Sequence, residues 1–257
     1  MKFRDLLVVV PHSGIIIPWE MPVSSLSVDF QRLLRNVDWY TDWLYDFRDM
    51  LGNSQITFPY CNLVLEGNRD PAHTENSVPL KDILNETVYR QNMEPDIKVR
   101  RFLSKKYLRP FHRDITKQIA GGMAFMLDGH STVTAQGLSD NQIELMNFQT
   151  NKVDGKITYF CPDMFIETYA NELTKLLPSI KVTVNESRYH MVYGHVCGKH
   201  STGHMNRYKN RVPAILQETN QLLYMNADKT PNLEALETLR RAFAEALYKM
   251  VRKIKRL

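Results

Sequence analysis

Two histidines in this sequence each follow a short apolar run and are themselves followed by serine. His12 comes shortly after Leu6–Val10, and His130 comes after Ala124–Leu127, within the stretch Asp-Gly-His-Ser. An apolar run of this length that ends in polar residues is typical of a buried strand whose carboxyl end opens into a site. A plain Asp-Gly turn would also explain the second stretch. The repeated pattern favours a functional site, because imidazoles bind metals and transfer protons.

A third apolar run, Val212–Leu216, leads into Glu218 in the same way. The carboxyl ends of parallel strands meet at one edge of a sheet, so His12, His130 and Glu218 can share one cleft. Two histidines and a carboxylate form an open zinc site that leaves a fourth position for water. In this hypothesis the metal activates the water, and Glu218 takes its proton as general base and passes it to the leaving group. The alternative is a Glu218 that only caps the following segment.

Arg69 lies in a loop after a predicted strand and is a candidate for substrate binding. A guanidinium binds a carboxylate through two parallel hydrogen bonds, although Arg69 and Asp70 could equally form a structural ion pair. Asp38 either caps or pairs on a helix, or it supplies the carboxylate ligand of the metal. The histidines between positions 190 and 204 do not have the spacing of a second metal site, and are either solvated or part of a substrate pocket.

Predicted strands and helices alternate along the chain, which indicates an α/β fold. We expect a three-layer α/β/α sandwich around a mixed, mostly parallel sheet, of the phosphorylase/hydrolase-like kind, in one domain that covers residues 1–257. The irregular segment at about 72–93 is predicted to be an insertion or a flap. Helices are expected at about 30–50, 96–119 with an interruption at Pro110, 163–177 and from 231, and strands at 6–10, 56–59, 62–65, 124–127, 156–160, 180–184 and 212–216.

The composition fits one globular domain of 257 residues with 43% hydrophobic residues and a net charge of +5. This mildly basic balance suits a small anionic substrate. The basic residues between Lys98 and Arg113 are distributed around a predicted helix, so nucleic acid is not the expected partner. Three distant cysteines without a paired motif indicate a reducing, cytoplasmic environment. No apolar run approaches the roughly 18 residues of a membrane span, so no membrane association is expected.

Several short motifs occur in an order that resembles the N-formylglutamate amidohydrolase family. The similarity extends from about residue 6 to residue 226, and the ordered set is more specific than any single motif. The family is in turn similar to zinc carboxypeptidases and aspartoacylases, which have an α/β/α fold around a mixed sheet. The motifs are Pro11-His12-Ser13-Gly14, Asp38, Asn68-Arg69-Asp70-Pro71, Tyr107-Leu108-Arg109-Pro110-Phe111-His112, Asp128-Gly129-His130-Ser131, and Gln217-Glu218-Thr219-Asn220 with Tyr224-Met225.

The resemblance implies roles for individual residues. It makes His12 and His130 ligands of one zinc ion, or of another divalent metal, and Glu218 the general base. Arg69, with Asn68, becomes the clamp on a substrate carboxylate. Carboxypeptidases place a glutamate ligand three residues after the first histidine, where this chain has Ile15. Asp38 is therefore the expected third ligand, and Asp128 is the alternative, with bracing of the His130 ring as its expected role. One or more of five further residues are expected to shape the substrate pocket: His112, His190, Tyr193, His195 and His204.

These observations predict a zinc-dependent hydrolase that cleaves the amide bond of an N-formyl or N-acyl amino acid, such as N-formylglutamate, with metal-activated water as the nucleophile. One alternative is a metallo-carboxypeptidase or amidase that acts on peptides or cell-wall fragments. Another is a non-catalytic binding protein that has kept the fold. The oligomeric state is left open.

Overall fold

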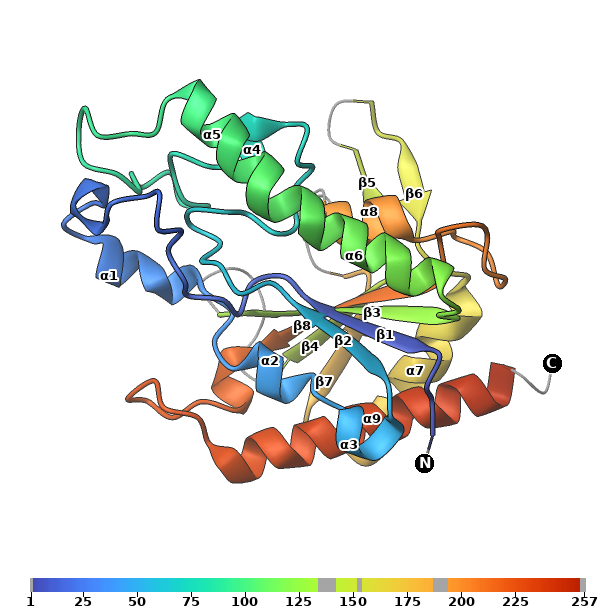
Figure 1. Ribbon diagram of the computed structural model, residues 1–257. Helices are drawn as coiled ribbons and strands as arrows, with labels where there is room; N and C mark the ends of the chain where they lie inside the picture. Colours follow the sequence, from blue (N-terminus) through green and yellow to red (C-terminus); the bar gives the residue numbers. More distant parts are fainter. Residues whose placement is uncertain (1, 134–141, 152–153, 187–193, 255–257) are drawn as a thin grey trace.

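The computed structural model describes residues 2–133, 142–151, 154–186 and 194–254 (Figure 1). Its central element is a six-stranded sheet with the strand order β2-β1-β3-β8-β4-β7. Neighbouring strands are parallel except for the antiparallel pair β4 and β8. The predicted mixed, mostly parallel sheet is thus confirmed. The strands are β1 (Leu6–Val10), β2 (Ser54–Thr57), β3 (Phe125–Thr132), β4 (Gln142–Met146), β7 (Lys181–Val184) and β8 (Ala214–Asn220).

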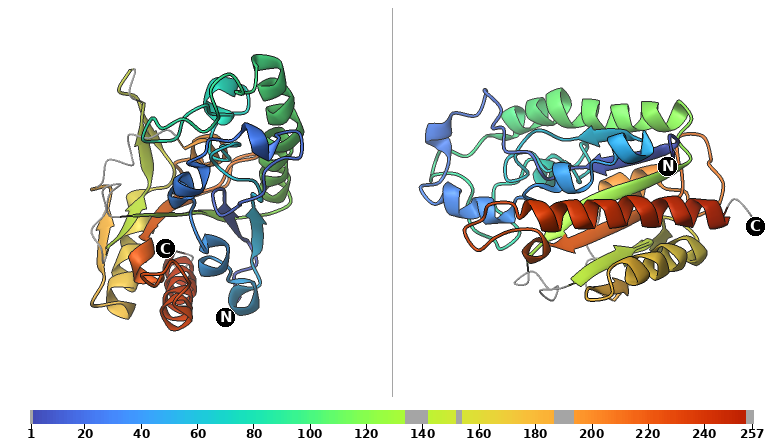
Figure 2. Two further views of the ribbon diagram at one scale, coloured as in Figure 1. Left: turned by 90° about the vertical axis from the view of Figure 1, so that its left-hand side faces the viewer. Right: turned by 90° about the horizontal axis from the view of Figure 1, so that it is seen from below.

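Helices cover both faces of this sheet and complete the three predicted layers. Figure 1 shows α5 (Ile97–Leu103) and α6 (Arg109–Ala120) above the sheet and α9 (Leu233–Ile254) below it. The short helix α8 (His195–His200) also packs on the α6 side. Helix α7 (Asp163–Leu176) lies against α9 on the opposite side, as the right-hand view of Figure 2 shows. In the described part of the chain, no helix combines the length and apolar character needed to cross a membrane.

The continuous apolar run of β1 follows from this double coverage. All five residues are buried. Leu6, Val8 and Val10 pack into the core under α7 and α9, whereas Leu7 and Val9 pack into the core under α6. A strand that is covered on both faces has no polar face, so its sequence shows no alternation.

The predicted interruption of the helix near Pro110 is confirmed. Asp96 caps α5 by accepting the backbone N–H groups of Lys98 and Val99 at 2.8 and 2.9 Å. A π-helical segment, Ser104–Leu108, then joins α5 to α6. Pro110 lies in the first turn of α6, where its missing N–H removes a helical hydrogen bond and permits the wider turn.

The single helix expected at about 30–50 is wrong. The structure has α1 (Phe30–Leu33), a 3-10 turn (Leu34–Asn36), α2 (Thr41–Leu44) and α3 (Arg48–Leu51) in its place. The chain leaves the helix at Val37, which is extended, and Tyr40 is left-handed with φ of +59°. Asp38 lies in this break, where its N–H donates to the carbonyl of His12 at 3.2 Å. A long-range hydrogen bond therefore overrides the helical periodicity.

Three further expectations need correction. Residues 62–65 form turns, in which the N–H groups of Val64 and Leu65 donate to the carbonyl of Cys61, and not a strand. Strands β4 and β5 (Phe148–Thr150) were not predicted; β5 pairs with β6 (Ile157–Tyr159) in a separate hairpin. Residues 195–200 form the helix α8, in which His195 and His200 are buried, so these two histidines are not solvated as the sequence allowed. The glycine and histidines of this segment mask the helical pattern.

Candidate functional site

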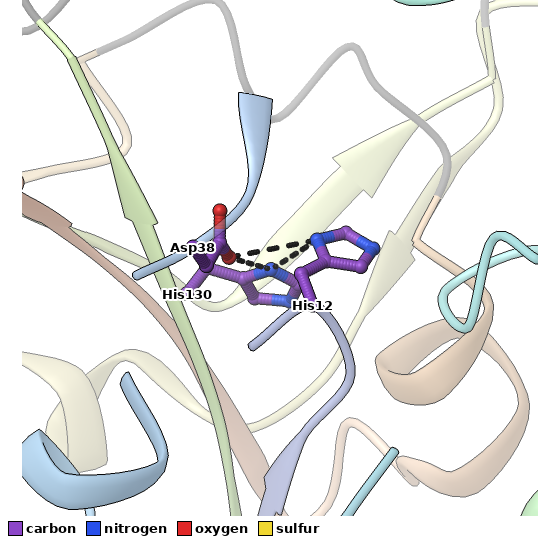
Figure 3. A group of neighbouring side chains, drawn as sticks. All are labelled: His12, Asp38 and His130. Atoms are coloured by element: carbon purple, nitrogen blue, oxygen red, sulfur yellow. Dashed lines mark hydrogen bonds and ion pairs between the residues drawn. The ribbon is translucent and has the colours of Figure 1, made fainter. Parts of the chain in front are cut away.

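Three side chains from separate segments converge at the carboxyl ends of the central strands (Figure 3). His12 follows β1, His130 lies near the end of β3, and Asp38 lies in the loop between the 3-10 turn and α2. The two Nδ1 atoms are 3.2 Å apart, and each is 3.5 Å from Oδ2 of Asp38. Within the described residues, this is the group of histidine, cysteine and carboxylate side chains close enough together to hold a metal ion.

The spacing of these atoms fits a tetrahedral zinc site. Zinc lies about 2.0–2.2 Å from nitrogen and oxygen ligands, so two ligands at the corners of a tetrahedron are about 3.3–3.6 Å apart. The two distances to Asp38, both 3.5 Å, lie within this range, and the distance between the two nitrogens, 3.2 Å, lies just below it. The donor set of two imidazoles and one carboxylate also suits zinc and leaves room for a further ligand.

The outer nitrogen of each imidazole faces a carboxylate. His12 Nε2 lies 2.5 Å from Glu66 Oε1, and His130 Nε2 lies 3.0 Å from Asp128 Oδ1. A proton on Nε2 that is donated to the carboxylate leaves the Nδ1 lone pair free to bind a metal. Asp128 therefore contacts the side of the His130 ring that faces away from His12 and Asp38. Glu66 was missed by the sequence analysis, because nothing local connects it to a histidine 54 residues earlier.

These carboxylates make the site strongly attractive to positive charge. Burial alone would lower the pKa of His12, but the charge of Glu66 and hydrogen bonds to Asp38 and Glu66 outweigh it and raise the pKa to about 9. Burial also opposes the pKa rise of His130, which Asp128 nevertheless drives well above the ordinary value. Glu66 shows the complementary effect: despite burial, the charges of His12 and Arg69 lower its pKa to about 2.

Glu218 lies beside His130 on the next strand. The two residues are register partners in β3 and β8, so their side chains project from the same face of the sheet. Burial raises the pKa of Glu218 to about 8; the His130 charge opposes this rise and Asp38 adds to it. Its Oε2 atom has no hydrogen-bond partner among the described residues. Glu218 is therefore a carboxyl group able to gain and lose a proton near neutral pH.

Gly129 brings the back of the site close to the core. A Cβ atom at this position would lie 2.6–2.9 Å from the ring of Tyr45. The Tyr45 hydroxyl donates to the carbonyl of His130 at 2.9 Å and lies 2.9 Å from Thr219 Oγ1. The Asp-Gly pair is therefore part of a strand, not a turn, and its glycine permits the close approach of Tyr45, which holds β3 beside β8.

The three converging side chains open into a cavity of about 670 Å³. Glu218, Asn68 and Arg69 line it, together with Arg100 and much of the segment between Glu75 and Asn85. This volume is typical of a small-molecule site. The segment that the sequence suggested as a flap thus forms a wall of the cavity, and its movement stays a prediction.

A comparison with known proteins now assigns the family. The family model described as N-formylglutamate amidohydrolase matches residues 4–225. This chain belongs to the N-formylglutamate amidohydrolase family. The resemblance expected from the ordered motifs is confirmed, and the chain is a hydrolase.

Individual relatives agree with this assignment. The chain is 27% identical over 239 residues to the N-formylglutamate deformylase of Pseudomonas aeruginosa, which covers 86% of this chain and 82% of the relative. The crystal structure of an N-formylglutamate amidohydrolase from Ralstonia eutropha JMP134 matches with a TM-score of 0.68 and 19% identity, over 100% of this chain and 96% of that one. A gene product from Agrobacterium tumefaciens matches with a TM-score of 0.69 and 17% identity, over 99% and 93%. The two structures support the shared fold.

In this family member, the side chain and carbonyl of Asn68 contact other residues of the chain. Its side-chain oxygen accepts the N–H of Val196 at 2.8 Å, and its side-chain nitrogen lies 3.2 Å from Nε2 of His130. Its carbonyl accepts the N–H of His195 at 2.9 Å and Nη1 of Arg69 at 3.1 Å. Asn68 therefore ties the amino end of α8 to the site, whereas Arg69 is half-buried at the cavity wall.

The other expected pocket residues lie elsewhere. His112 and His195 are buried between α6 and α8, where the ring of His112 is 4.7 Å from that of His195 and 5.9 Å from that of His200. Burial, reinforced by neighbouring positive charges, lowers the pKa to about 2 for His112 and about 3 for His200; for His195 burial, partly offset by Asp70, lowers it to about 4. His204 is exposed. None of these four lines the cavity, and Tyr193 and His190 lie outside the described residues.

Proposed function

We propose that this hydrolase is zinc-dependent and cleaves the amide bond of N-formylglutamate or a closely similar N-acyl amino acid. The observation that carries the proposal is the cluster of His12, Asp38 and His130 ligand atoms, 3.2–3.5 Å apart, beside Glu218 in one cavity. The name of the Pseudomonas aeruginosa relative supports the choice of substrate.

His12, Asp38 and His130 would hold the metal ion. A bound zinc ion would polarise the carbonyl of the scissile amide and acidify a water molecule. Glu66 and Asp128 would keep both imidazoles in the tautomer that directs Nδ1 toward the metal. Their negative charge also favours a cation at this place.

Glu218 would transfer the proton. Its position beside His130, and its Oε2 without a hydrogen-bond partner in the described part of the chain, suit a general base that receives a proton from water. A cation held by the neighbouring ligands would lower the pKa of Glu218 from about 8, so that the carboxylate accepts the proton and the acid so formed releases it to the departing amine. Arg69 at the cavity wall would bind a carboxylate of the substrate.

The metal content of the protein tests the first half of the proposal. Protein purified without chelator is expected to contain about one zinc ion per chain, and His130→Ala is expected to lose it. His200→Ala is the matched control, because His200 is a buried histidine outside the cluster and its loss should leave the metal in place. A folded wild-type protein that binds no metal after zinc is added would contradict the proposal.

A substrate panel tests the second half. Release of formate from N-formylglutamate is expected, with much slower cleavage of peptides that carry a free carboxyl terminus. The reverse preference would indicate a carboxypeptidase-like or cell-wall amidase activity. Binding of these compounds without turnover by the zinc-loaded protein would indicate a binding protein.

A further inference from the structure

A buried arginine, Arg100, lines the same cavity as the proposed metal ligands. It belongs to α5 and is 9% exposed. Its Nε donates to the carbonyl of Val78 at 2.9 Å, and its Nη2 donates to the carbonyls of Thr74 and Glu75 at 3.3 and 3.1 Å. Among the described residues its Nη1 has no hydrogen-bond partner. The guanidinium is therefore held through Nε and Nη2, and the N–H groups of Nη1 remain as donors.

The partners of Arg100 orient its charge but do not neutralise it. A guanidinium is always ionised in a protein, and backbone carbonyls carry no net charge. No carboxylate forms an ion pair with Arg100 in the described part of the chain. A buried charge without a counter-charge is costly, and the planar guanidinium edge matches a carboxylate in shape. The cavity thus offers a preorganised receptor for an anion.

A short series of contacts connects Arg100 to the proposed metal site. Val78 follows Ser77, whose carbonyl accepts the N–H of Glu66 at 2.9 Å. Glu66 in turn contacts His12 at 2.5 Å. Arg100 and the ligand cluster are therefore walls of one cavity, and its volume of about 670 Å³ accommodates a small dicarboxylic compound.

Other charged residues also line the cavity. Asp82 is committed to the protein, because its carboxylate accepts the N–H groups of Leu84 and Glu86 and the side-chain amide of Asn36. Glu75 and Lys81 are exposed. Besides Arg69, Lys81 is a further cation of the cavity wall, but its side chain is exposed, and among the described residues no hydrogen bond or ion pair orients it. Arg100 combines burial, a fixed orientation and unused donors.

We propose that Arg100 binds a second carboxylate of the substrate, distinct from the one assigned to Arg69, and so selects N-acyl derivatives of dicarboxylic amino acids. This inference rests on the proposed function and adds a specificity residue to it. The Nη1 edge would donate to the carboxylate while the Nε and Nη2 contacts to residues 74, 75 and 78 hold the guanidinium in place.

The test compares two substrates of nearly the same shape, N-formyl-L-glutamate and N-formyl-L-glutamine, which differ in the charge of the side chain. The wild type is expected to favour the glutamate compound in kcat/KM by about 10- to 100-fold, the range of a charge-assisted hydrogen bond. Arg100→Gln is expected to reduce this ratio to near unity. Arg101→Gln, which removes the same charge from the exposed neighbouring position, is expected to keep the wild-type ratio.

The ratio is independent of the folded fraction, because both substrates are measured on the same preparation. Three results would overturn the assignment to Arg100: a wild type without preference, an Arg100→Gln variant that keeps the preference, or a Lys81→Gln variant that loses it. In each case, hydrolysis of the substrates would still support the proposed function. If neither substrate is hydrolysed, the proposed function fails. Calorimetry with glutarate and its monoamide then tests whether Arg100 binds a carboxylate. Tighter binding of glutarate that depends on Arg100 supports the receptor, and equal binding refutes it.

Discussion

Two groups of buried histidines in this molecule have opposite electrostatic environments. His130, 3% exposed, belongs to the cluster with His12 and Asp38, and its pKa is raised. His112, 1% exposed, belongs to the cluster with His195 and His200, and its pKa is lowered to about 2. Burial favours the neutral form in both places. The difference comes from the charges nearby: several carboxylates contact the first cluster, whereas the second has the other imidazoles and Lys199 beside it, with Asp70 only near His195.

The comparison shows that burial of a histidine does not by itself indicate its function. The first cluster is built to attract a cation, with Glu66 and Asp128 behind the rings. The second cluster packs as neutral aromatic rings between two helices. Four variants test this contrast, and their expected effects decrease from Glu218→Gln to Asn68→Ala.

Glu218→Gln tests whether the carboxylate-rich cluster performs the chemistry. The variant removes the group that accepts a proton but keeps the size of the side chain, so kcat is expected to fall by about 10²- to 10⁴-fold. Zinc content should stay at the wild-type level, because Glu218 is not one of the three converging ligands. Measurement of kcat and bound metal on the same sample checks both. A variant that retains wild-type turnover would remove Glu218 from the mechanism.

His112→Phe tests the neutral cluster through the pH dependence of stability. The unfolded chain takes up a proton at His112 below about pH 6.5, whereas the folded chain does not until about pH 2, so stability falls as pH falls below 6.5. Between about pH 6.5 and pH 4.5 this loss is about 2–3 kcal/mol for one histidine, and the variant should lack it. Denaturant unfolding at both pH values measures the change. His204→Phe, at an exposed position, is the control, and an unchanged pH dependence in His112→Phe would refute the account.

Glu66→Gln tests the carboxylate behind His12. Loss of a carboxylate that orients a metal-binding imidazole is expected to weaken zinc binding by about 10- to 100-fold. The affinity can be measured by competition with a chromophoric chelator, without any assay of activity. Glu75→Gln, at an exposed position on the cavity wall, is the matched control. Equal affinities of wild type and Glu66→Gln would show that the 2.5 Å contact has no part in metal binding.

Asn68→Ala tests the connection between the two clusters. The change leaves the N–H of Val196 buried without its acceptor and removes the contact with His130. We expect a loss of about 1–2 kcal/mol in the free energy of unfolding. Chemical denaturation measures it, with Asn76→Ala on the exposed surface as control. A variant as stable as the wild type would show that α8 keeps its place without Asn68.

Local sequence patterns predicted most of the framework. The apolar runs at 6–10 and 124–127 correspond to β1 and β3, and the periodic segment from about 231 corresponds to α9. Strand β4 escaped prediction because it carries Gln142 and Glu144, whose hydrogen-bond partners include Thr183 on the neighbouring strand β7. Asp38 was expected within a helix for a similar reason: the hydrogen bond to His12 that breaks the helix comes from a distant segment.

The sequence alone determined that His12, His130 and Glu218 stand at the ends of apolar segments, because a strand and its polar end are local features of the chain. The tertiary structure decided which histidines have carboxylate neighbours. Glu66 and Arg100 come from segments far along the chain from His12, and only folding brings them to the same cavity. A pKa depends on burial and on charges within a few ångströms. Histidines that look alike in the sequence therefore form a site that attracts a cation in one place and pack as neutral rings in another.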